Sequence, residues 1–449
     1  MMDEGTDRRD FLKRLVAGAA VAGSGAGGLG LAGCAPGEQE PGEEGPADGR
    51  PGGEQTGASP TLPQGLAPDD SRWRDVRDHF LLDPDYTYMN TAGLGPSPRP
   101  VLAAHLEAWE RLERRSETGH GERAGIRTTA AAFLGCVEDE LAFTRSATES
   151  MNLVARGLRL EAGDQVLMTT HEHPGGAMPW FGVREDVAIR IDTFEPGTGG
   201  DDTLNRLEAA LTGRTRVVMV SHVTCTTGMI LPVREMAQLC RDRGIILVLD
   251  GAQAPGQIPV NLNELACSFY VASGHKWLLG PKGTGFLYVR DEWLDRWKPS
   301  YVGAYSDTGF DLASGGFERL RPASASEYGT RSTPLLVGFG AAFDFLSSLG
   351  LDPVTARGAH LATMMRDGLA PLPGVEIITP QGASAAILSF RLPPSGGSPG
   401  EWCNRLRADH NLRLRPVTEA GLMAVRASTH VFNTEEEVQR LVEVLGSLL

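Results

Sequence analysis

The sequence predicts an α/β protein whose main sheet is mostly parallel. Residues 216–220 and 245–249 are runs of the length of a strand, rich in apolar and β-branched side chains. Between them, Pro232 and Gly244 bracket residues 233–243, as proline and glycine do at the two ends of a helix. Strands joined by one crossover helix lie parallel, and continuous apolar runs are typical of strands covered on both faces. The sequence therefore predicts a βαβ core.

Polar side chains follow two of the predicted strands. The run 245–249 ends at a carboxylate, and a further apolar run, 269–272, leads into a hydroxyl, an imidazole and an amine. Ligands of open α/β sheets bind outside the carboxyl ends of the strands, so these groups are expected to converge. The residues concerned are Asp250, Gln253, Ser273, His275 and Lys276.

These residue types match the groups that pyridoxal phosphate (PLP) needs. Lys276 can form a Schiff base with the aldehyde, and Asp250 can keep the pyridine nitrogen protonated so that the ring accepts electrons. Gln253 can donate to the phenolic oxygen, and Ser273 and His275 can donate to the phosphate. A helix cap or a solvated lysine would explain Asp250 or Lys276 alone. The two patterns Asp-x-x-Gln and Ser-x-His-Lys, each after a buried strand, favour the cofactor.

The segment that begins with DGAQAPGQIPV at Asp250 and ends with FYVASGHKWLLGPKGTGFLYV at Val289 resembles class V aminotransferase-like enzymes. That family belongs to the fold-type I PLP-dependent transferases and includes cysteine desulfurases, selenocysteine lyases, isopenicillin N epimerase-like proteins and small-molecule transaminases. The resemblance runs from about Asp85 to the C-terminus. It implies a large domain with a mostly parallel, seven-stranded type of sheet, expected over residues 69–335 together with the N-terminal segment of the small domain. A smaller α+β C-terminal domain is expected over 336–449.

The same resemblance implies further contacts with the cofactor. Ala147 and Thr148, at a predicted helix start, would bind its phosphate, because the N-terminus of a helix attracts anions. Thr148 could equally be the N-cap of that helix. His173 would stack on the pyridine ring, with His171 as the alternative, and no metal is expected at these histidines because no partner cluster follows. Thr330 would reach the phosphate of a neighbouring subunit, which implies a homodimer with a shared active site.

Two residues are candidates for binding the substrate. Asn90 lies in a segment that resembles the family's substrate mouth, although a turn explains it equally well. Arg426 matches the family arginine that pairs with the substrate carboxylate, and a guanidinium suits that role because it can bind a carboxylate through two parallel hydrogen bonds. A surface ion pair is the alternative for Arg426. Around it, the sequence predicts strands over 386–390, 412–414 and 423–428.

The resemblance also implies a reaction. An amino acid or small amine would join the cofactor as an external aldimine, and the freed amine of Lys276 would remove the α-proton, with His173 and Asp250 in the catalytic set. We expect an aminotransferase. The alternative is an epimerase or C–S lyase, because the pattern over residues 413–433 looks closest to the isopenicillin N epimerase branch. A third hypothesis is a non-catalytic surface lipoprotein.

Cysteine desulfurase activity is predicted to be absent. Desulfurases need a cysteine on the loop before the carboxylate-binding arginine, and the chain has none between Leu412 and Arg426. Cys403 lies earlier, in a predicted helix. The six cysteines are scattered without the spacing of a zinc site or a disulfide framework.

The N-terminal residues resemble an export signal. Residues 6–13 contain paired arginines like those of the twin-arginine motif, and the sequence Leu-Ala-Gly-Cys ending at Cys34 resembles a bacterial lipobox. We therefore expect residues 1–34 to be a signal peptide, Cys34 to be lipidated, and the protein to be a periplasmic or cell-surface lipoprotein. A flexible Gly/Ala-rich tail is the alternative. Residues 35–68, rich in Gly, Pro, Glu and Asp, predict a disordered acidic linker.

The overall charge limits the partners. The chain has 449 residues and a formal net charge of −15, which argues against a nucleic-acid partner. The expected partners are a small-molecule substrate, a second copy of the chain, and a membrane only through the lipid anchor.

Overall fold

The computed structural model describes residues 62–382 and 385–449. The predicted signal peptide, Cys34 and most of the predicted linker lie outside these residues, so export and lipidation stay predictions. The described residues belong to one compact unit. The division into a large and a small domain after residue 335 also stays a prediction, since helix α11 (Thr333–Leu349) crosses that point.

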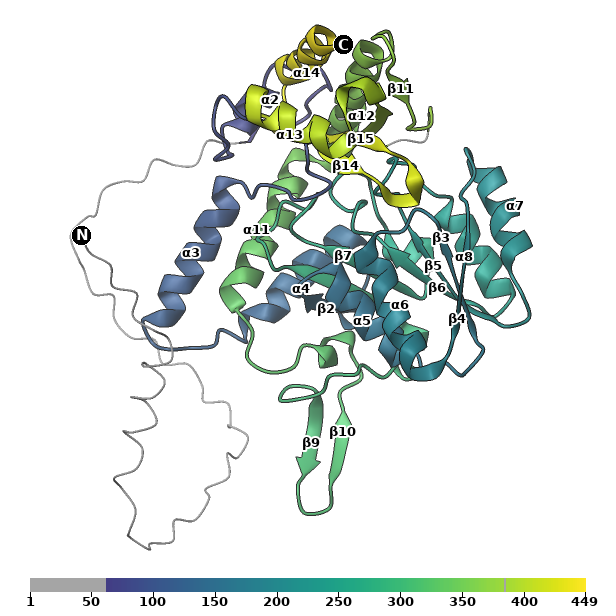
Figure 1. The fold of residues 1–449 in the computed structure, drawn as a ribbon. Coiled ribbons are helices and arrows are strands. Elements are labelled where there is room, and N and C mark those ends of the chain that lie inside the picture. Colours follow the sequence, from purple (N-terminus) through teal and green to yellow (C-terminus); the bar gives the residue numbers. More distant parts are fainter. Residues whose placement is uncertain (1–61, 383–384) are drawn as a thin grey trace, which may run out of the picture. The chain divides into compact units, whose positions relative to one another are not determined.

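A seven-stranded sheet forms the centre of the fold, with the strand order β2-β8-β7-β6-β5-β3-β4 (Figure 1). Strand β8 runs antiparallel to both of its neighbours, and the other pairs are parallel. The predicted, mostly parallel sheet is therefore confirmed. Its strands are β2 (Leu141–Thr144), β3 (Gln165–Thr169), β4 (Arg190–Phe194), β5 (Thr215–Ser221), β6 (Ile246–Asp250), β7 (Phe269–Ser273) and β8 (Gly285–Val289).

The sheet is buried on both faces. Along β5, Val218 and Val220 pack into one hydrophobic core, whereas Val217 and Met219 pack into another. Alternate side chains of a strand point to opposite faces, so a strand between two cores must be apolar throughout. The helices along this part of the chain are α5 (Ala147–Gly157), α6 (Pro174–Val187), α7 (Gly200–Ala210), α8 (Val233–Asp242), α9 (Leu262–Leu265) and α10 (Asp291–Leu294).

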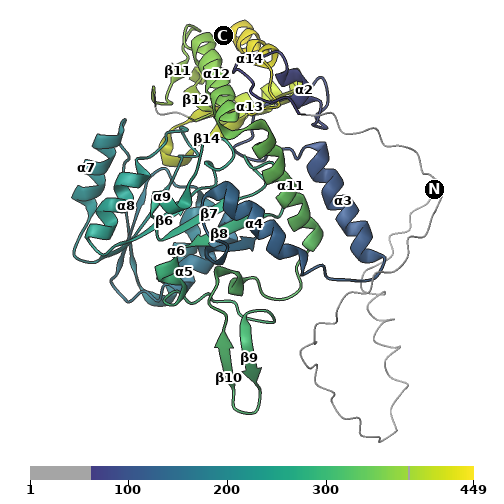
Figure 2. The same cartoon turned by 180° about the vertical axis from the view of Figure 1, so that it is seen from behind.

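Three further helices pack together beside the sheet. Helix α11 lies against both α3 (Arg99–Glu113) and α4 (Glu122–Leu134), and both views show α3 and α11 side by side (Figures 1 and 2). Within residues 62–382 and 385–449, no single helix is long and apolar enough to cross a membrane. Helices α11 and α12 (Leu351–Leu369) meet that criterion only together, across a bend of 80°.

A second, antiparallel sheet has the order β11-β12-β15-β14. Its strands are β11 (Glu376–Ile377), β12 (Ile387–Arg391), β14 (Arg415–Val417) and β15 (Ala424–Ser428), and it packs with α12, α13 (Pro399–His410) and α14 (Glu435–Leu448). The predicted strand near residues 412–414 is present, but it does not join this sheet. Strand β13 (Leu412–Arg413) instead pairs with β1 (Thr87–Tyr88), a partner more than 300 residues away in the sequence, and β14 follows it in the other sheet.

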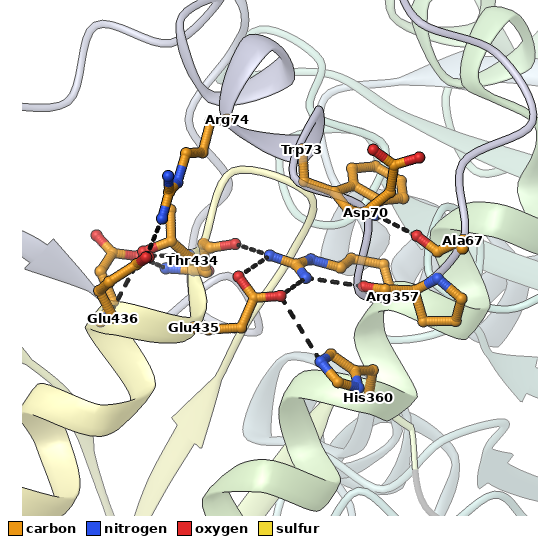
Figure 3. A network of polar contacts seen from close by, with 12 residues as sticks. Ala67, Asp70, Trp73, Arg74, Arg357, His360, Thr434, Glu435 and Glu436 are labelled. Atoms are coloured by element: carbon orange, nitrogen blue, oxygen red, sulfur yellow. Dashed lines mark hydrogen bonds and ion pairs between the residues drawn. The ribbon is translucent and has the colours of Figure 1, made fainter.

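The first described segment of the chain, residues 62–77, contacts a polar cluster around a buried arginine (Figure 3). Arg357 on α12 pairs with Glu435 at the start of α14 through both terminal guanidinium nitrogens, Nη1 and Nη2. It also donates to the carbonyl oxygen of Pro68 at 2.8 Å and to that of Asn433 at 3.0 Å. Trp73, on the short helix α2 (Trp73–Arg77), lies under the guanidinium, with 5.6 Å between Arg357 Cζ and the ring centroid. One side chain thus joins the N-terminal segment to two distant helices.

We expect Arg357→Met to lower the free energy of unfolding by about 3 kcal/mol, because it leaves a carboxylate and two carbonyl groups without their donor. Denaturant titration measures this loss. The control is Arg114→Met, since Arg114 forms an exposed pair with Glu110 and should lose less than about 0.5 kcal/mol. Equal losses in the two variants would show that the cluster does not stabilise the fold.

Candidate active site

A cavity of about 230 Å³ lies where β6 and β7 end and α5 and α6 begin. Among the described residues, it brings together every residue predicted for the site except Asn90 and Thr330. The predicted residues on its wall are Ala147, Thr148, His173, Asp250, Gln253, Ser273, His275, Lys276 and Arg426.

Parallel pairing of β6 with β7 explains this convergence. Asp250 is the last residue of β6 and lies opposite Val271 of β7, so the two strands end at the same edge of the sheet. Ser273 is the last residue of β7, and Lys276 follows three residues later. The Asp250 carboxylate accepts a hydrogen bond of 2.9 Å from the amide of Ala252, which holds it in place beside the cavity.

Lys276 has an amine suited to proton transfer. Its residue is only 9% exposed, and burial lowers the pKa of its amine, with Arg426 and Arg415 adding to that effect and Asp250 opposing it. Burial disfavours the charged form because the amine loses its hydration. A larger fraction of Lys276 is therefore neutral near pH 7 than of an exposed lysine.

The start of helix α5 forms a cradle for an anion. The side chain of Ser146, rather than that of Thr148, is the N-cap and accepts from Glu149 N at 3.2 Å, which leaves Thr148 on the cavity wall. The amide of Ala147 donates to Ser273 Oγ at 3.1 Å. The buried Nδ1 of His275 has no partner among the described residues. The start of α5, the hydroxyl of Ser273 and the unbonded ring nitrogen of His275 together fit a phosphate.

The structure separates the two candidate histidines. His173 is the N-cap of α6, and its Nδ1 accepts from Gly175 N at 3.0 Å, so the ring lies at the cavity. Burial and the neighbouring Lys276 lower the pKa of His173, which keeps the ring neutral near pH 7. His171 is instead bonded to Thr226 Oγ1 at 2.7 Å and to Glu195 at 3.0 Å, and it does not line the cavity.

Gln253 is held at both ends of its amide. Nε2 donates to the carbonyl oxygen of Ala92 at 2.9 Å, and Oε1 accepts from Trp277 Nε1 at 2.7 Å. An amide nitrogen carries two hydrogens, so one remains to donate to a ligand.

Arg426 is buried at the other end of the cavity, with 1% of the residue exposed. It donates from Nη1 to the carbonyl oxygen of Cys225 at 2.6 Å and from Nη2 to Asn90 Oδ1 at 3.1 Å, while Nε has no partner among the described residues. Burial and the nearby Arg415 lower its pKa to about 10, so it stays charged at neutral pH. Asn90 therefore lies behind Arg426 and orients it rather than lining the cavity.

Sequence analysis missed Arg415, which also lines the cavity. Arg415 on β14 lies directly opposite Arg426 on β15, and it forms an ion pair with Glu419. The sequence shows arginines at 413 and 415, but only the pairing register of two strands identifies Arg415 as the neighbour of Arg426. Two guanidinium groups at one end make the cavity suited to anionic ligands.

A second missed residue is Glu172, buried behind the sheet edge. Its carboxylate accepts hydrogen bonds from the hydroxyl of Thr169 and from both the amide (3.1 Å) and the hydroxyl (2.6 Å) of Ser221. Burial raises the pKa of Glu172 to about 7. In the sequence, Glu172 has no role beyond its place between two histidines, whereas its contacts join β3 to β5. Among the described residues, no group of three His, Cys, Asp or Glu side chains could hold a metal ion.

The structure does not bring Thr330 to this cavity. Thr330 lines a different cavity, together with Arg145, Tyr328 and Arg331, so its predicted contact with a neighbouring subunit stays a prediction. Cys403 is buried in the hydrophobic core beside the four-stranded sheet, where burial raises the pKa of its thiol to about 12.

The sheet, the cavity at its carboxyl edge and the lysine–aspartate pair are those of a fold-type I PLP-dependent enzyme. Residues 110–441 match the sequence model of the family described as aminotransferase class-V. The chain belongs to this family, and its cofactor is pyridoxal 5'-phosphate.

Curated relatives include enzymes with different reactions. The isopenicillin N epimerase of Amycolatopsis lactamdurans is 33% identical over 405 residues, covering 84% of this chain and 98% of that protein. A probable cysteine desulfurase of Methanothermobacter thermautotrophicus is 28% identical over 399 residues, with the same two coverages.

Solved structures agree on the fold. The apo structure of a cysteine desulfurase from Thermococcus onnurineus superposes with a TM-score of 0.75 at 28% identity, over 83% of this chain and 97% of that chain. A variant of C-DES, with glycine covalently linked to its PLP cofactor, superposes with a TM-score of 0.76 at 26% identity, over 82% and 98%.

We expect Glu172→Gln to change the pH dependence of stability. The folded-state pKa of about 7 exceeds the ordinary value of 4.5, so the folded protein binds this proton more tightly and loses stability as pH rises between those values. The glutamine variant cannot ionise, so relative to the wild type it should gain about 3 kcal/mol between pH 4 and pH 8. Denaturant titrations at several pH values measure the difference. A constant difference between Glu172→Gln and the wild type across this pH range would refute the assignment.

We also expect Arg415→Gln to alter the ionisation of Lys276. Uptake of PLP by apo-protein requires the neutral amine, so its rate should rise with pH through the Lys276 pKa, below the ordinary value of 10.5. Removing the Arg415 charge removes one cause of that lowered pKa, so the midpoint should move to higher pH. Arg413→Gln, a change outside the cavity, should leave it unmoved. Stopped-flow absorbance measures the midpoint, and an unchanged value in Arg415→Gln would contradict the coupling.

Proposed function

We propose that the protein removes the α-proton of an amino acid, with Lys276 as the base. The observation that carries this proposal is the placement of a buried amine and a buried guanidinium, Lys276 and Arg426, on the wall of one cavity with Asp250. A base and a carboxylate-binding group are what an α-amino acid needs in order to be held and deprotonated.

Each residue has a proposed role in holding the cofactor. When bound, PLP accepts the electron pair left by proton removal. Asp250 would pair with the protonated ring nitrogen, and Gln253 would donate its free amide hydrogen to the phenolic oxygen. Ala147 and Thr148, at the start of α5, would hold the phosphate, with Ser273 and His275 as further donors. Thr330 of a second subunit remains part of this proposal.

The remaining residues act on the substrate. Arg426 binds the α-carboxylate through nitrogens that are already oriented by Asn90 and the carbonyl oxygen of Cys225. Lys276, whose pKa is lowered by burial, receives the α-proton. His173 would stack on the ring and is a second neutral proton carrier, which reaches the cavity from a different element, the start of α6.

Epimerisation is the outcome that we propose for the deprotonated substrate. Two isopenicillin N epimerases, 33% and 32% identical, align over 98% of their own length. Transamination, which we expected from the sequence, is the second candidate, since the family is described by that activity. The solved cystine C–S lyase C-DES supports elimination as a further alternative. Desulfurase chemistry is not proposed, because no cysteine among the described residues lines the cavity.

Product analysis in deuterium oxide tests the proposal. The purified PLP-loaded protein is mixed with a panel of L- and D-amino acids, including dipeptides and tripeptides with a free α-amino acid end. An epimerase incorporates deuterium at the α-carbon and interconverts the two forms without a 2-oxo acid. A transaminase converts its own visible absorbance band to that of pyridoxamine phosphate and recovers it with a 2-oxo acid. A lyase releases a 2-oxo acid with sulfide or another leaving group.

Variants test the assigned residues. Lys276→Ala should lower the rate of deuterium exchange by about 10²–10⁴-fold. Arg426→Lys keeps the charge but loses the planar fork, so it should raise KM by about tenfold or more. The control is Arg391→Lys: Arg391 on β12 forms an exposed ion pair with Glu376 on β11, so KM should stay unchanged. Deuterium exchange at the wild-type rate in Lys276→Ala would refute Lys276 as the base.

A further inference from the structure

A second cavity, of about 250 Å³, lies outside the active site beside the start of helix α4. We call it the Arg123 cavity. Its wall combines three basic side chains with one carboxylate and two hydroxyls, from three separate parts of the chain. The polar residues on the wall are His120, Arg123, Arg127, Tyr305, Ser324 and Glu327.

Arg123 is a buried guanidinium without a counter-ion among the described residues. The residue is 7% exposed, and its single hydrogen bond runs from Nη2 to the carbonyl oxygen of Arg331, at 3.2 Å. Its buried Nε has no partner within residues 62–382 and 385–449. An arginine keeps its charge in proteins, and a buried charge without a partner costs several kcal/mol.

The carboxylate on the wall, Glu327, attracts Arg123 only from a distance: its charge raises the pKa of Arg123, but its hydrogen bonds go to other donors. Glu327 Oε1 accepts from Arg127 Nη1 and from the amide of Phe143, both at 2.6 Å. Glu327 Oε2 accepts from Arg127 Nη2 at 3.2 Å. Arg127 and Glu327 therefore form a closed pair, and the Arg331 guanidinium nearby adds a further positive charge. The wall keeps an excess of positive charge.

His120 supplies a second donor that has no partner. Its Nε2 is buried and unbonded among the described residues, and its ring lies edge-on to Tyr305, with 4.4 Å between the centroids. Burial and Arg123 lower the pKa of His120, so the ring is neutral near pH 7 and can carry its hydrogen on Nε2. Tyr305 itself has a left-handed backbone, with φ of 74°, which a tyrosine rarely adopts. Such strain collects at ligand sites.

We propose that the Arg123 cavity binds an oxyanion, a carboxylate or a tetrahedral anion such as phosphate, through Arg123 and His120. An anion there would neutralise the guanidinium, and charge-assisted hydrogen bonds would satisfy both orphaned donors. Two sources could supply the same chemistry: a free ion, or a carboxylate side chain of a second copy of the chain. The second source is relevant because Arg331, which accepts from Arg123, adjoins Thr330, the residue predicted to reach a neighbouring subunit.

The first arm of the test is thermal stability in different anions. The PLP-loaded protein, whose active-site phosphate position is filled, is heated in chloride, phosphate, sulfate or acetate at equal ionic strength. An oxyanion that binds the folded protein raises Tm with a saturable concentration dependence. We expect this rise in the wild type, a smaller rise in Arg123→Lys and none in Arg123→Met. The control is Arg366→Met, because Arg366 is also partly buried and bonded only to carbonyl oxygens, and it should respond like the wild type.

The second arm measures self-association by analytical ultracentrifugation. If a carboxylate of a second copy is the anion, Arg123→Met should weaken the dimer at least about tenfold while Arg366→Met does not, and added oxyanions should compete with the wild-type dimer. The proposal is overturned if Arg123→Met matches Arg366→Met in both the anion response and the association. If Arg123→Met does not fold, His120→Ala is the test variant. It should weaken the response to phosphate, or the dimer, about tenfold. A wild-type response in His120→Ala would then overturn the proposal.

Discussion

The parallel pairing of β6 with β7 is the constraint on which the rest of the site depends. It aligns the last residues of the two strands at one edge, so that Asp250 and Ser273 reach the same cavity and Lys276 follows within a few residues. Neighbouring β5 continues the alignment, with Ser221 opposite Asp250. Strands with apolar residues on both faces cannot slide past each other without exposing them, so the positions of the polar ends are secure.

The second sheet completes the cavity through buried hydrogen bonds to the large sheet's loops. Ser389 Oγ donates to the carbonyl oxygen of Thr226 at 2.6 Å, and Thr379 Oγ1 donates to that of Thr227 at 2.7 Å. The same loop offers the carbonyl oxygen of Cys225 to Arg426. The position of the carboxylate-binding arginine therefore depends on how the two sheets dock, and buried hydrogen bonds specify that arrangement because each unmade one costs about 1–3 kcal/mol.

Within the described residues, two buried arginines of this molecule, Arg426 and Arg123, are hydrogen-bonded to neutral oxygen atoms and not to carboxylates. Arg426 also faces a second cation, Arg415, whose own ion pair is with Glu419. Like charges facing each other across a sheet destabilise it, and burial adds a desolvation cost. An anionic ligand offsets both costs, so binding one should increase the stability of the folded protein. The polar cluster around Arg357 is the contrast, because there the carboxylate of Glu435 completes the pair within the chain.

The sequence by itself determined the mostly parallel sheet, the cofactor and the family, because continuous apolar strands and the residues at their carboxyl ends are local patterns. Five residues expected from the strand ends, and four more implied by the family resemblance, lie on one cavity wall in the structure. The tertiary structure alone decided three things: Asn90 lies behind Arg426, Arg415 lies opposite it, and Glu172 joins β3 to β5. Each of these contacts depends on which distant segments pair and in what register. The residues that make them lie far apart in the sequence, so no local pattern connects them.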